Sequence, residues 1–439
     1  MKVLIFGLGL NGGGFEAATY FLKRKDEVRI TDLKRKSSFG KAVSKLEALG
    51  GTFILGEHRE EDFLWADIVV KNTVILPSNK YLLLTKEIIT DFSFLFDNYR
   101  LVNTKLIIVT GTKGKTTTTS FITHTLKHLG YKVKMCGNMG ISAFKIAQYL
   151  DDYDKKLDYL VCEFSSWQLR DLKLYSNLEM PYIEVAAITN IMEDHQNTYE
   201  NMSHYISDKL FLFNNKINFA LCPKSLMPQI KKISKLKRRK IIDINAGKYE
   251  KLGNQVELIP ACNILKTQKI NEKDIYEKLK TYHGVPHRIQ WIGTVNNVSF
   301  VNDSAATISE AVQFTFSHFT YFGVNLICGG TDKNLKANGM INALKNSNSL
   351  TLLDGSFTQN KLIPLLDELK IDYNGPFKSM RKATRCAYNI AKEKYEKSQV
   401  EQIVLLSPGA SSFDLFINEF DRGNKFREAF RAIRGKINT

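Results

Sequence analysis

The sequence contains no long unbroken apolar run. None of its stretches approaches the roughly 20 consecutive apolar residues that cross a bilayer, so we expect no membrane span. The N-terminal run from Val3 to Leu10 is short, contains two glycines and leads into further glycines. This pattern predicts a buried strand that ends in a tight loop, rather than a signal peptide.

Cysteines are few, and their spacing excludes a common class of metal site. The six cysteines stand at positions 136, 162, 222, 262, 328 and 386, and no two have CxxC spacing. We therefore expect no structural zinc site. The scatter favours a reduced, cytoplasmic setting.

Acidic residues are outnumbered by basic ones. The chain has 62 Lys and Arg against 45 Asp and Glu, which gives a formal net charge of +17. Such an excess is compatible with a polyanionic partner. The densest basic stretch, residues 231–240, fits either a solvated surface segment or a contact region.

The remaining pattern is typical of an α/β protein. Apolar strand-like runs alternate with helical stretches, which predicts mostly parallel sheets. The predicted strands are residues 3–6, 27–31, 106–109, 159–162, 185–189, 299–301, 326–328 and 403–406. We place domains at residues 1–95, 96–288 and 289–439, and the pattern is weakest over 215–285.

The first predicted strand is followed by a glycine loop. Residues 7–12 match GxGxxG, and Asp32 follows about 20 residues later. The candidate contacts of this loop are Gly7, Gly9, Leu10, Asn11 and Gly12. Glycines let the backbone approach a diphosphate, so the loop predicts a nucleotide-diphosphate site. A plain tight turn, or the cofactor site of a nicotinamide dehydrogenase, would use the same pattern.

A second glycine loop follows the strand at 106–109. Its candidate phosphate-binding residues are Gly111, Thr112, Lys113, Gly114, Lys115, Thr116 and Thr117. Backbone amides of such a loop cradle phosphates, the lysine reaches the β and γ oxygens, and the threonine hydroxyl holds Mg²⁺. Val109 replaces the first glycine of the general pattern, and the alternative is an incidental loop.

Polar residues end the next two strands. Glu163 ends one strand, and His195 lies in the loop after another. If the strands are parallel, both side chains face the phosphates, where a carboxylate would complete a Mg²⁺ shell with Thr116. A helix cap at Ser165 and a solvated acidic loop at 193–194 explain the same residues.

Taken together, these motifs resemble the Mur ligase family. The matching segments, in chain order, are residues 111–117, 137–140, 163–168, 193–195 with Tyr205 and Lys209, 286–288, 302–304 and 329–333. The resemblance implies three domains: a Rossmann-like domain for a UDP-sugar, a central P-loop ATPase domain, and a Rossmann-like C-terminal domain for an amino acid.

The C-terminal segment is similar to that of the family members that add D-glutamate. Residues 405–414 and 422–426 carry this likeness. They also fit a capped helix whose Phe413, Phe416 and Phe420 pack inward. The resemblance implies small-molecule substrates, UDP-N-acetylmuramoyl-L-alanine and D-glutamate, which ATP joins through an acyl phosphate.

The resemblance also assigns roles to single residues. It implies catalytic roles for Lys115, Glu163, His195 and Lys209. It implies two Mg²⁺ ions, held by Thr116, Glu163, His195 and a carbamylated Lys209. It implies ATP contacts from Asn263, Arg288 and Asp303, UDP-sugar contacts from Asp32, Asn138 and Gln168, and amino-acid contacts from Lys333, Ser412 and Phe413. Without the family, Lys209 is predicted to be a surface lysine.

Three segments depart from the family pattern. Cys262 replaces a histidine, Ala305 replaces a lysine, and Asn72-Thr73-Val74 replaces a Ser-Pro-Gly turn. We expect a monomeric cytoplasmic ligase with no nucleic-acid or membrane partner. The alternatives are another Mur or folylpolyglutamate ligase, a nucleic-acid-stimulated P-loop ATPase, and a nicotinamide dehydrogenase.

Overall fold

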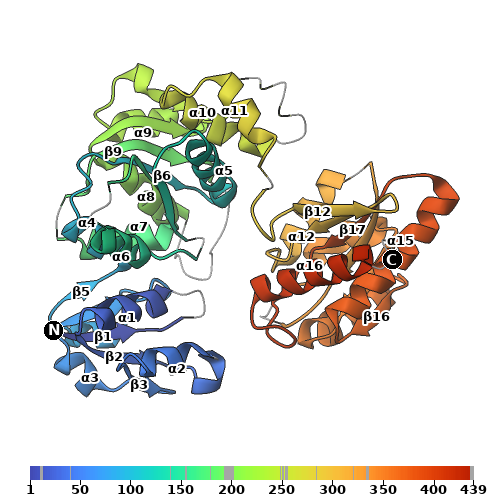
Figure 1. The fold of residues 1–439 in the computed structure, drawn as a ribbon, viewed down its shortest axis with the longest axis horizontal. Coiled ribbons are helices and arrows are strands. Elements are labelled where there is room, and N and C mark those ends of the chain that lie inside the picture. The colour runs from blue at the N-terminus through green and yellow to red at the C-terminus, as the bar shows by residue number, and fades with distance from the viewer. Residues whose placement is uncertain are drawn as a thin grey trace. The chain divides into compact units, whose positions relative to one another are not determined.

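The computed structural model shows three sheets in two compact units, Met1–Tyr282 and His283–Thr439 (Figure 1). The structure describes residues 1–9, 13–39, 41–138, 140–153, 156–177, 179–191, 202–247, 249, 252, 256–282, 284–319, 321–332 and 336–435. The predicted α/β class with three sheet-containing parts is confirmed. None of the helices in these ranges is long and apolar enough to span a membrane.

The first sheet is parallel throughout, with the strand order β3-β2-β1-β4-β5. Its strands are β1 (Lys2–Phe6), β2 (Glu27–Asp32), β3 (Thr52–Leu55), β4 (Ile68–Lys71) and β5 (Ile88–Ile89). The helices α1 (Gly13–Lys23), α2 (Lys41–Glu47) and α3 (Glu60–Trp65) connect the first four. The apolar β1 lies in the middle and is buried along most of its length, so the loop that follows it opens at the carboxyl edge of the sheet.

The second sheet is also parallel, with the order β11-β10-β9-β6-β8-β7. Its strands are β6 (Lys105–Thr110), β7 (Val133–Gly137), β8 (Tyr159–Glu163), β9 (Ile183–Ile188), β10 (Ile217–Cys222) and β11 (Ile241–Asp243). Its helices are α4 (Asp91–Asn98), α5 (Lys115–His128), α6 (Ala143–Tyr153), α7 (Ser166–Tyr175), α8 (Met202–Leu210), α9 (Met227–Ile233), α10 (Ile259–Thr267) and α11 (Glu272–Leu279). Because β6 lies between β8 and β9, the ends of all three strands meet at one edge.

One hydrophobic core joins the first two sheets. Aromatic rings from α1, α4 and α6 meet there: Tyr20 and Phe94 have ring centres 5.2 Å apart, and Phe94 and Phe144 have ring centres 4.9 Å apart. Beside them, the Tyr20 hydroxyl donates to Asp151 at 2.9 Å. A buried ion pair between Lys71 and Asp171 links β4 to α7 across the same interface.

The third sheet forms the second unit, with the order β12-β13-β17-β14-β15-β16. Its strands are β12 (Gln290–Val295), β13 (Val298–Asn302), β14 (Gly323–Cys328), β15 (Ser349–Leu353), β16 (Asn374–Phe377) and β17 (Gln402–Leu406). Its helices are α12 (Ser309–Phe316), α13 (Ile341–Asn346), α14 (Ile363–Glu368), α15 (Met380–Ser398) and α16 (Glu419–Gly435). Only β12 runs antiparallel, as a hairpin with β13.

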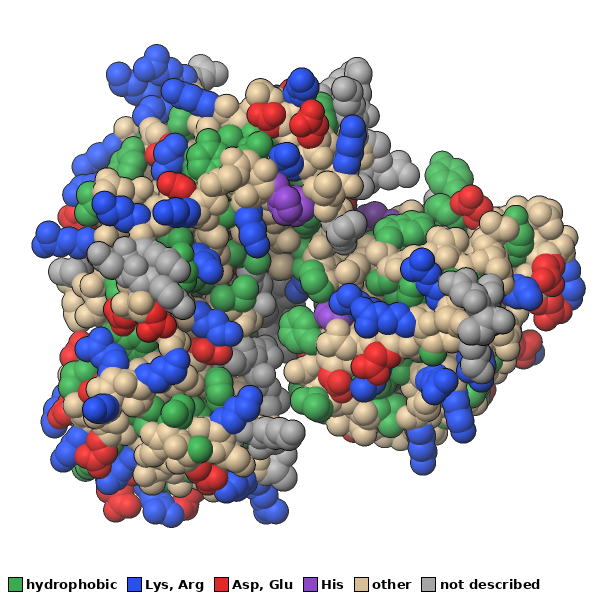
Figure 2. All heavy atoms as spheres, in the orientation of Figure 1, with side chains coloured by type: hydrophobic (Ala, Val, Ile, Leu, Met, Phe, Trp, Pro, Cys, Tyr) green, Lys and Arg blue, Asp and Glu red, His purple; other side chains and the backbone are tan. Residues whose placement is uncertain are grey.

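The basic segment predicted at 231–240 covers the end of α9 and the turn after it. Lys231, Lys232, Lys235, Lys237 and Arg239 are exposed. Figure 2 shows Lys and Arg side chains gathered over the end of this unit where α9 lies. The exposure of these side chains fits both interpretations of the segment, a solvated surface and a contact region.

Candidate active site

The second glycine loop connects β6 to α5, and its backbone conformation favours glycine at two positions. Gly111 has φ +140°, and a Cβ atom there would lie 2.0 Å from the Thr189 hydroxyl. Gly114 has φ +81° and occupies the N-cap of α5. Both conformations favour glycine, so the loop can turn tightly onto the start of a helix, where anions bind.

Two residues after β9 hold this loop from outside. The Thr189 hydroxyl donates to the Lys113 carbonyl at 2.6 Å, and the Asn190 side chain accepts from the Lys113 amide at 2.9 Å. The Thr112 amide donates to the Asn190 carbonyl at 3.0 Å. These bonds fix the loop before any ligand binds. Sequence reasoning gave Asn190 no role, although its place directly after a strand was a usable signal.

Lys115 and Thr116 open helix α5, where the phosphates of a nucleotide would lie. The Lys115 ammonium donates to the carbonyls of Gly111 and Thr112 at 3.0 and 2.8 Å. It therefore sits over the loop that the pattern predicts will cradle phosphates. Thr116 and Thr117 follow in the first turn and are partly exposed.

Glu163 ends the strand beside β6, in register with Val109. Its carboxylate is 1% exposed. One oxygen accepts from the Asn138 amide at 3.2 Å, whereas the other, Oε2, is buried without a partner among the described residues. A buried, unpartnered carboxylate oxygen is costly, and a cation at that position would remove the cost.

Lys209 lies in the last turn of α8 and is 2% exposed, so its interpretation as a surface lysine is wrong. Its ammonium donates to the Gly111 carbonyl at 2.9 Å and lies 4.5 Å from the centre of the Tyr205 ring. The Tyr205 hydroxyl in turn lies 2.9 Å from the Thr112 hydroxyl. The YxxxK pair of α8 therefore packs directly beneath the phosphate loop.

Known proteins are similar to this chain along almost its whole length. The sequence pattern of the Mur ligase middle domain matches residues 109–281. A UDP-N-acetylmuramoylalanine–D-glutamate ligase from Borreliella afzelii is 34% identical, over 98% of this chain and 97% of its own length. The chain belongs to the Mur ligase family. A protein of the same name from Treponema pallidum is 26% identical, over 98% of this chain and 97% of its own length.

Solved structures agree with the Mur ligase fold. A UDP-N-acetylmuramate–alanine ligase from Thermotoga maritima superposes with a TM-score of 0.58 at 14% identity, covering 98% of this chain and 99% of its own. At this identity the likeness concerns the fold alone. Mur ligases are ATP-dependent, ADP-forming ligases, and this chain belongs to that enzyme class.

In this Mur ligase, the first glycine loop is braced by two side chains. The Asp32 carboxylate accepts from the amides of Leu8 and Gly9 at 3.0 and 3.4 Å. Asn72 donates to the Gly7 carbonyl at 3.1 Å. A Cβ atom on Gly9 would lie 2.8 Å from the Asn72 amide nitrogen, so both sides of the loop are filled by polar groups.

Gln168 and Asn263 are hydrogen-bonded within the first unit. Gln168 forms a capping box with Ser165 at the start of α7, as the structural alternative predicted. Asn263 is buried, accepts from the Tyr249 hydroxyl at 2.7 Å, and donates to two backbone carbonyls after β11. Asn263 thus shapes the turn after β11, and its adenine contact stays a prediction.

In the second unit, the carboxylate of Asp303 is satisfied internally. It accepts from the hydroxyls of Thr315 and Ser407 at 2.6 and 2.9 Å and from the Ile289 amide at 3.2 Å. Burial nevertheless raises its pKa from 3.8 to about 6. Arg288 is exposed, so of these two predicted ATP contacts only Arg288 presents its charge to solvent.

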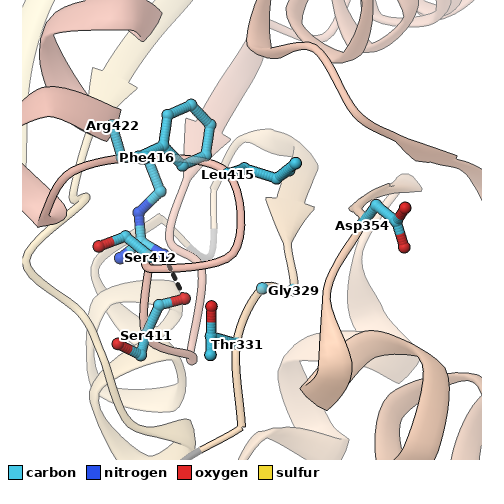
Figure 3. Close-up of a pocket in the computed structure, with 9 residues that line it drawn as sticks. Gly329, Thr331, Asp354, Ser411, Ser412, Leu415, Phe416 and Arg422 are labelled. Atoms are coloured by element: carbon cyan, nitrogen blue, oxygen red, sulfur yellow. Dashed lines mark hydrogen bonds between the residues drawn. The ribbon is translucent and has the colours of Figure 1, made fainter. Parts of the chain in front are cut away.

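The loops after β14 and β17 line a small pocket in the second unit. Its lining includes Thr331, Asp354, Ser411, Ser412 and Arg422, with Leu415 and Phe416 at its rim (Figure 3). Of the predicted amino-acid contacts, Ser412 is buried here, whereas Phe413 is 42% exposed. Phe413 is therefore not packed inward, which contradicts the alternative of a capped helix with this ring in the core.

Several predicted site residues lie outside the described part of the chain. These are Leu10, Asn11, Gly12, His195 and Lys333. Among the residues that are described, no cluster of three or more His, Cys, Asp or Glu side chains could hold a metal ion. Of the predicted catalytic and metal-binding residues, the structure places Lys115, Thr116, Glu163 and Lys209 at the phosphate loop.

Proposed function

We propose that this Mur ligase joins D-glutamate to UDP-N-acetylmuramoyl-L-alanine at the expense of ATP, as a step of peptidoglycan precursor synthesis. The substrate carboxylate attacks the γ-phosphorus of ATP, which gives an acyl phosphate and ADP. The amine of D-glutamate then attacks the acyl carbon. An amide forms, phosphate leaves, and the amine loses a proton.

The observation that carries the proposal is the buried Oε2 of Glu163 beside the phosphate loop. Glu163 is in register with Val109, the residue before the last of β6, and its free oxygen needs a cation. A triphosphate on the loop would bring Mg²⁺ to that edge. The names of the relatives that match almost the whole chain support the choice of D-glutamate and UDP-N-acetylmuramoyl-L-alanine.

Catalysis in this proposal is positioning and charge neutralisation. Lys115 moves from the loop carbonyls to the transferring phosphoryl group. Thr116 and Glu163 would hold one Mg²⁺, which neutralises phosphate charge when bound. Asn138 steadies the other Glu163 oxygen, which keeps the free oxygen aimed in one direction.

Lys209 fits the carbamate that the family resemblance implies. An ammonium would repel a second Mg²⁺, whereas a carbamate is an anion that, with His195, would hold it. A carbamate keeps one Nζ–H, which can still donate to the Gly111 carbonyl as Lys209 does here at 2.9 Å. The buried site beside the Tyr205 ring also shields the modification from water.

The remaining assignments belong to the same proposal. The first glycine loop and Asp32 bind the UDP end, and Asn138 and Gln168 line the path of the sugar. Asn263, Arg288 and Asp303 orient ATP, and Ser412, Phe413 and Lys333 contact D-glutamate. ATP and nucleotide sugars are cytoplasmic, so we place the enzyme in the cytoplasm. We also propose that it acts as a monomer and binds two Mg²⁺ ions.

The test is ADP release by the purified protein with ATP, Mg²⁺, UDP-N-acetylmuramoyl-L-alanine and a panel of amino acids. We expect turnover with D-glutamate and none when the UDP-sugar is omitted or replaced by DNA or RNA. Lys115→Ala should abolish it, whereas Lys127→Ala, an exposed lysine on the same helix, should not. Preference for another amino acid, or stimulation by nucleic acid, would contradict the proposal.

The carbamate has its own measurement. Lys209→Ala should lose most activity, and short carboxylic acids should restore part of it by replacing the missing anion. Depleting carbon dioxide should slow the wild-type enzyme but leave the rescued variant unaffected. An unchanged rate in Lys209→Ala would remove this residue from the site.

A further inference from the structure

Arg422 is a fully buried cation with only neutral partners. It lies in α16 and is 0% exposed. Its Nε donates to the Ser304 hydroxyl at 3.0 Å and its Nη2 to the Ser304 carbonyl at 2.8 Å. Its Nη1 donates to the carbonyls of Ala410 and Ser411 at 2.9 and 3.1 Å.

The bonds of Arg422 join two loops that follow neighbouring strands of the third sheet, and a third loop is attached to one of them. Ser304 follows β13, and Ser411 follows β17. Thr331, after β14, exchanges two backbone hydrogen bonds with Ser411, at 2.9 and 3.2 Å. Since β13, β17 and β14 are adjacent and parallel, all three loops lie at one edge. Arg422 joins the loops after β13 and β17, and the two bonds between Thr331 and Ser411 attach the loop after β14.

The next residue along α16 shows how closely this helix fits the loops. A Cβ atom on Gly423 would lie 2.1 Å from the His287 ring, and the Gly423 carbonyl accepts from the Asn302 side chain at 3.0 Å. At Gly423 the backbone of the helix therefore packs directly against the His287 ring, and a side chain on residue 423 would not fit. This contact fixes where the Arg422 side chain emerges.

The guanidinium of Arg422 forms no ion pair with a carboxylate in the described part of the chain. Of the described residues, none places a carboxylate within ion-pair distance of the guanidinium, and burial lowers its pKa to about 9 although Glu419 and Asp303 act in the opposite direction. A buried positive charge without a counter-ion makes its surroundings attractive to an anion. Those surroundings are the pocket between Thr331, Ser412 and Asp354 (Figure 3).

We propose that Arg422 is a positioning and specificity-determining residue of this pocket, and that its uncompensated charge selects an incoming amino acid with an additional carboxylate. The inference deepens the proposed function and rests on it for the identity of the pocket's ligand. Arg422 acts through the carbonyls and hydroxyls that it orients, and through its charge.

The test compares D-glutamate with its neutral analogue D-glutamine in Arg422→Met and Arg422→Lys. We expect Arg422→Met to raise the KM for D-glutamate by roughly 10-fold to 100-fold and to leave the KM of ATP and the UDP-sugar within about 2-fold. The preference for D-glutamate over D-glutamine should fall by a similar factor. Arg422→Lys keeps the charge but not the fork of donors, so it should retain most of the preference.

The matched control is Arg431→Met, an exposed arginine on the same helix. It should change none of these constants. If Arg422→Met does not fold, Ser304→Ala removes the hydroxyl that accepts from Arg422 and donates to the Glu419 carbonyl. This smaller change should raise the KM for D-glutamate about 3-fold. Equal changes in all three KM values, or an unchanged preference in a folded Arg422→Met protein, would overturn the inference.

A binding measurement separates this inference from the proposed function. Equilibrium dialysis of radiolabelled D-glutamate with the full chain, ADP and Mg²⁺ requires no turnover. Retention by the wild type that is lost in Arg422→Met supports the inference even if no ligation is detected. Equal retention by both proteins would overturn the inference and leave the ligase proposal standing.

Discussion

The two units of this chain bury cations in different ways. In the first unit, Lys71 donates to the Asp171 carboxylate at 2.5 Å, and both side chains are almost fully buried. In the second unit, Arg422 is equally buried but donates to carbonyls and a hydroxyl. One charge is neutralised within the protein, and the other is only hydrogen-bonded.

The difference indicates what each charge does. Burial is the largest influence on both members of the Lys71–Asp171 pair: it lowers the pKa of Lys71 and raises that of Asp171. Each group is therefore costly without the other, and the pair fixes β4 against α7. Where the structure describes the chain, Arg422 has no such partner, which is expected of a charge that faces a ligand pocket.

Asp171→Ala should have the largest effect on stability. It leaves Lys71 buried without a counter-ion, which costs about 3–5 kcal/mol. Urea unfolding followed by circular dichroism would measure this loss in the first unit. Asp152→Ala, an exposed aspartate of α6, is the control. A loss below about 1 kcal/mol would show that the Lys71 ammonium becomes solvated or bonds to another group in the variant.

Asp303 gives a pH test, since it is a buried carboxylate bonded to hydroxyls and an amide rather than to a cation. Its folded pKa of about 6 exceeds the ordinary 3.8, so the folded state holds this proton more tightly. The resulting stability, roughly 3 kcal/mol, is present below pH 4 and lost as pH rises to 6. Asp303→Asn should weaken the dependence of the melting temperature on pH between pH 4 and 6. An unchanged dependence would contradict the raised pKa of Asp303.

Arg422→Met should have a smaller effect on stability than Asp171→Ala. It leaves carbonyls without donors, but it also removes a buried charge and leaves no opposite charge behind. We expect a loss of about 2 kcal/mol in the second unit, measured by the same unfolding experiment. A loss as large as that of Asp171→Ala would make Arg422 a structural residue first.

The double variant Lys71→Met with Asp171→Leu should have the smallest effect. Replacing a buried ion pair by apolar side chains of similar volume is often close to neutral, so we expect a change within about 1 kcal/mol. The double-mutant cycle gives the coupling between the two residues directly. A double variant as unstable as Asp171→Ala would show that the charges themselves hold the two sheets together.

The strands and the phosphate loop could be predicted because their signals are local. All eight predicted strands overlap strands of the structure. Most of them are short apolar runs, and residues 27–31 alternate polar and apolar side chains. The strands that escaped prediction include β7, which mixes Lys134 with Met135, and β12, whose Trp291 is exposed. Their residues alternate between environments, so no continuous apolar run marked them.

The sequence by itself determined the glycine loops, the α/β class and the family motifs. Glycine at a positive φ and apolar runs act within a few residues of the chain, so their pattern can be seen without a fold. Only the tertiary structure decided that Lys209 is buried under the phosphate loop, that Lys71 pairs with a residue 100 positions away, and that Arg422 binds Ser304 118 positions away. Burial and charge pairing depend on which distant segments pack together, and the local sequence does not contain that information.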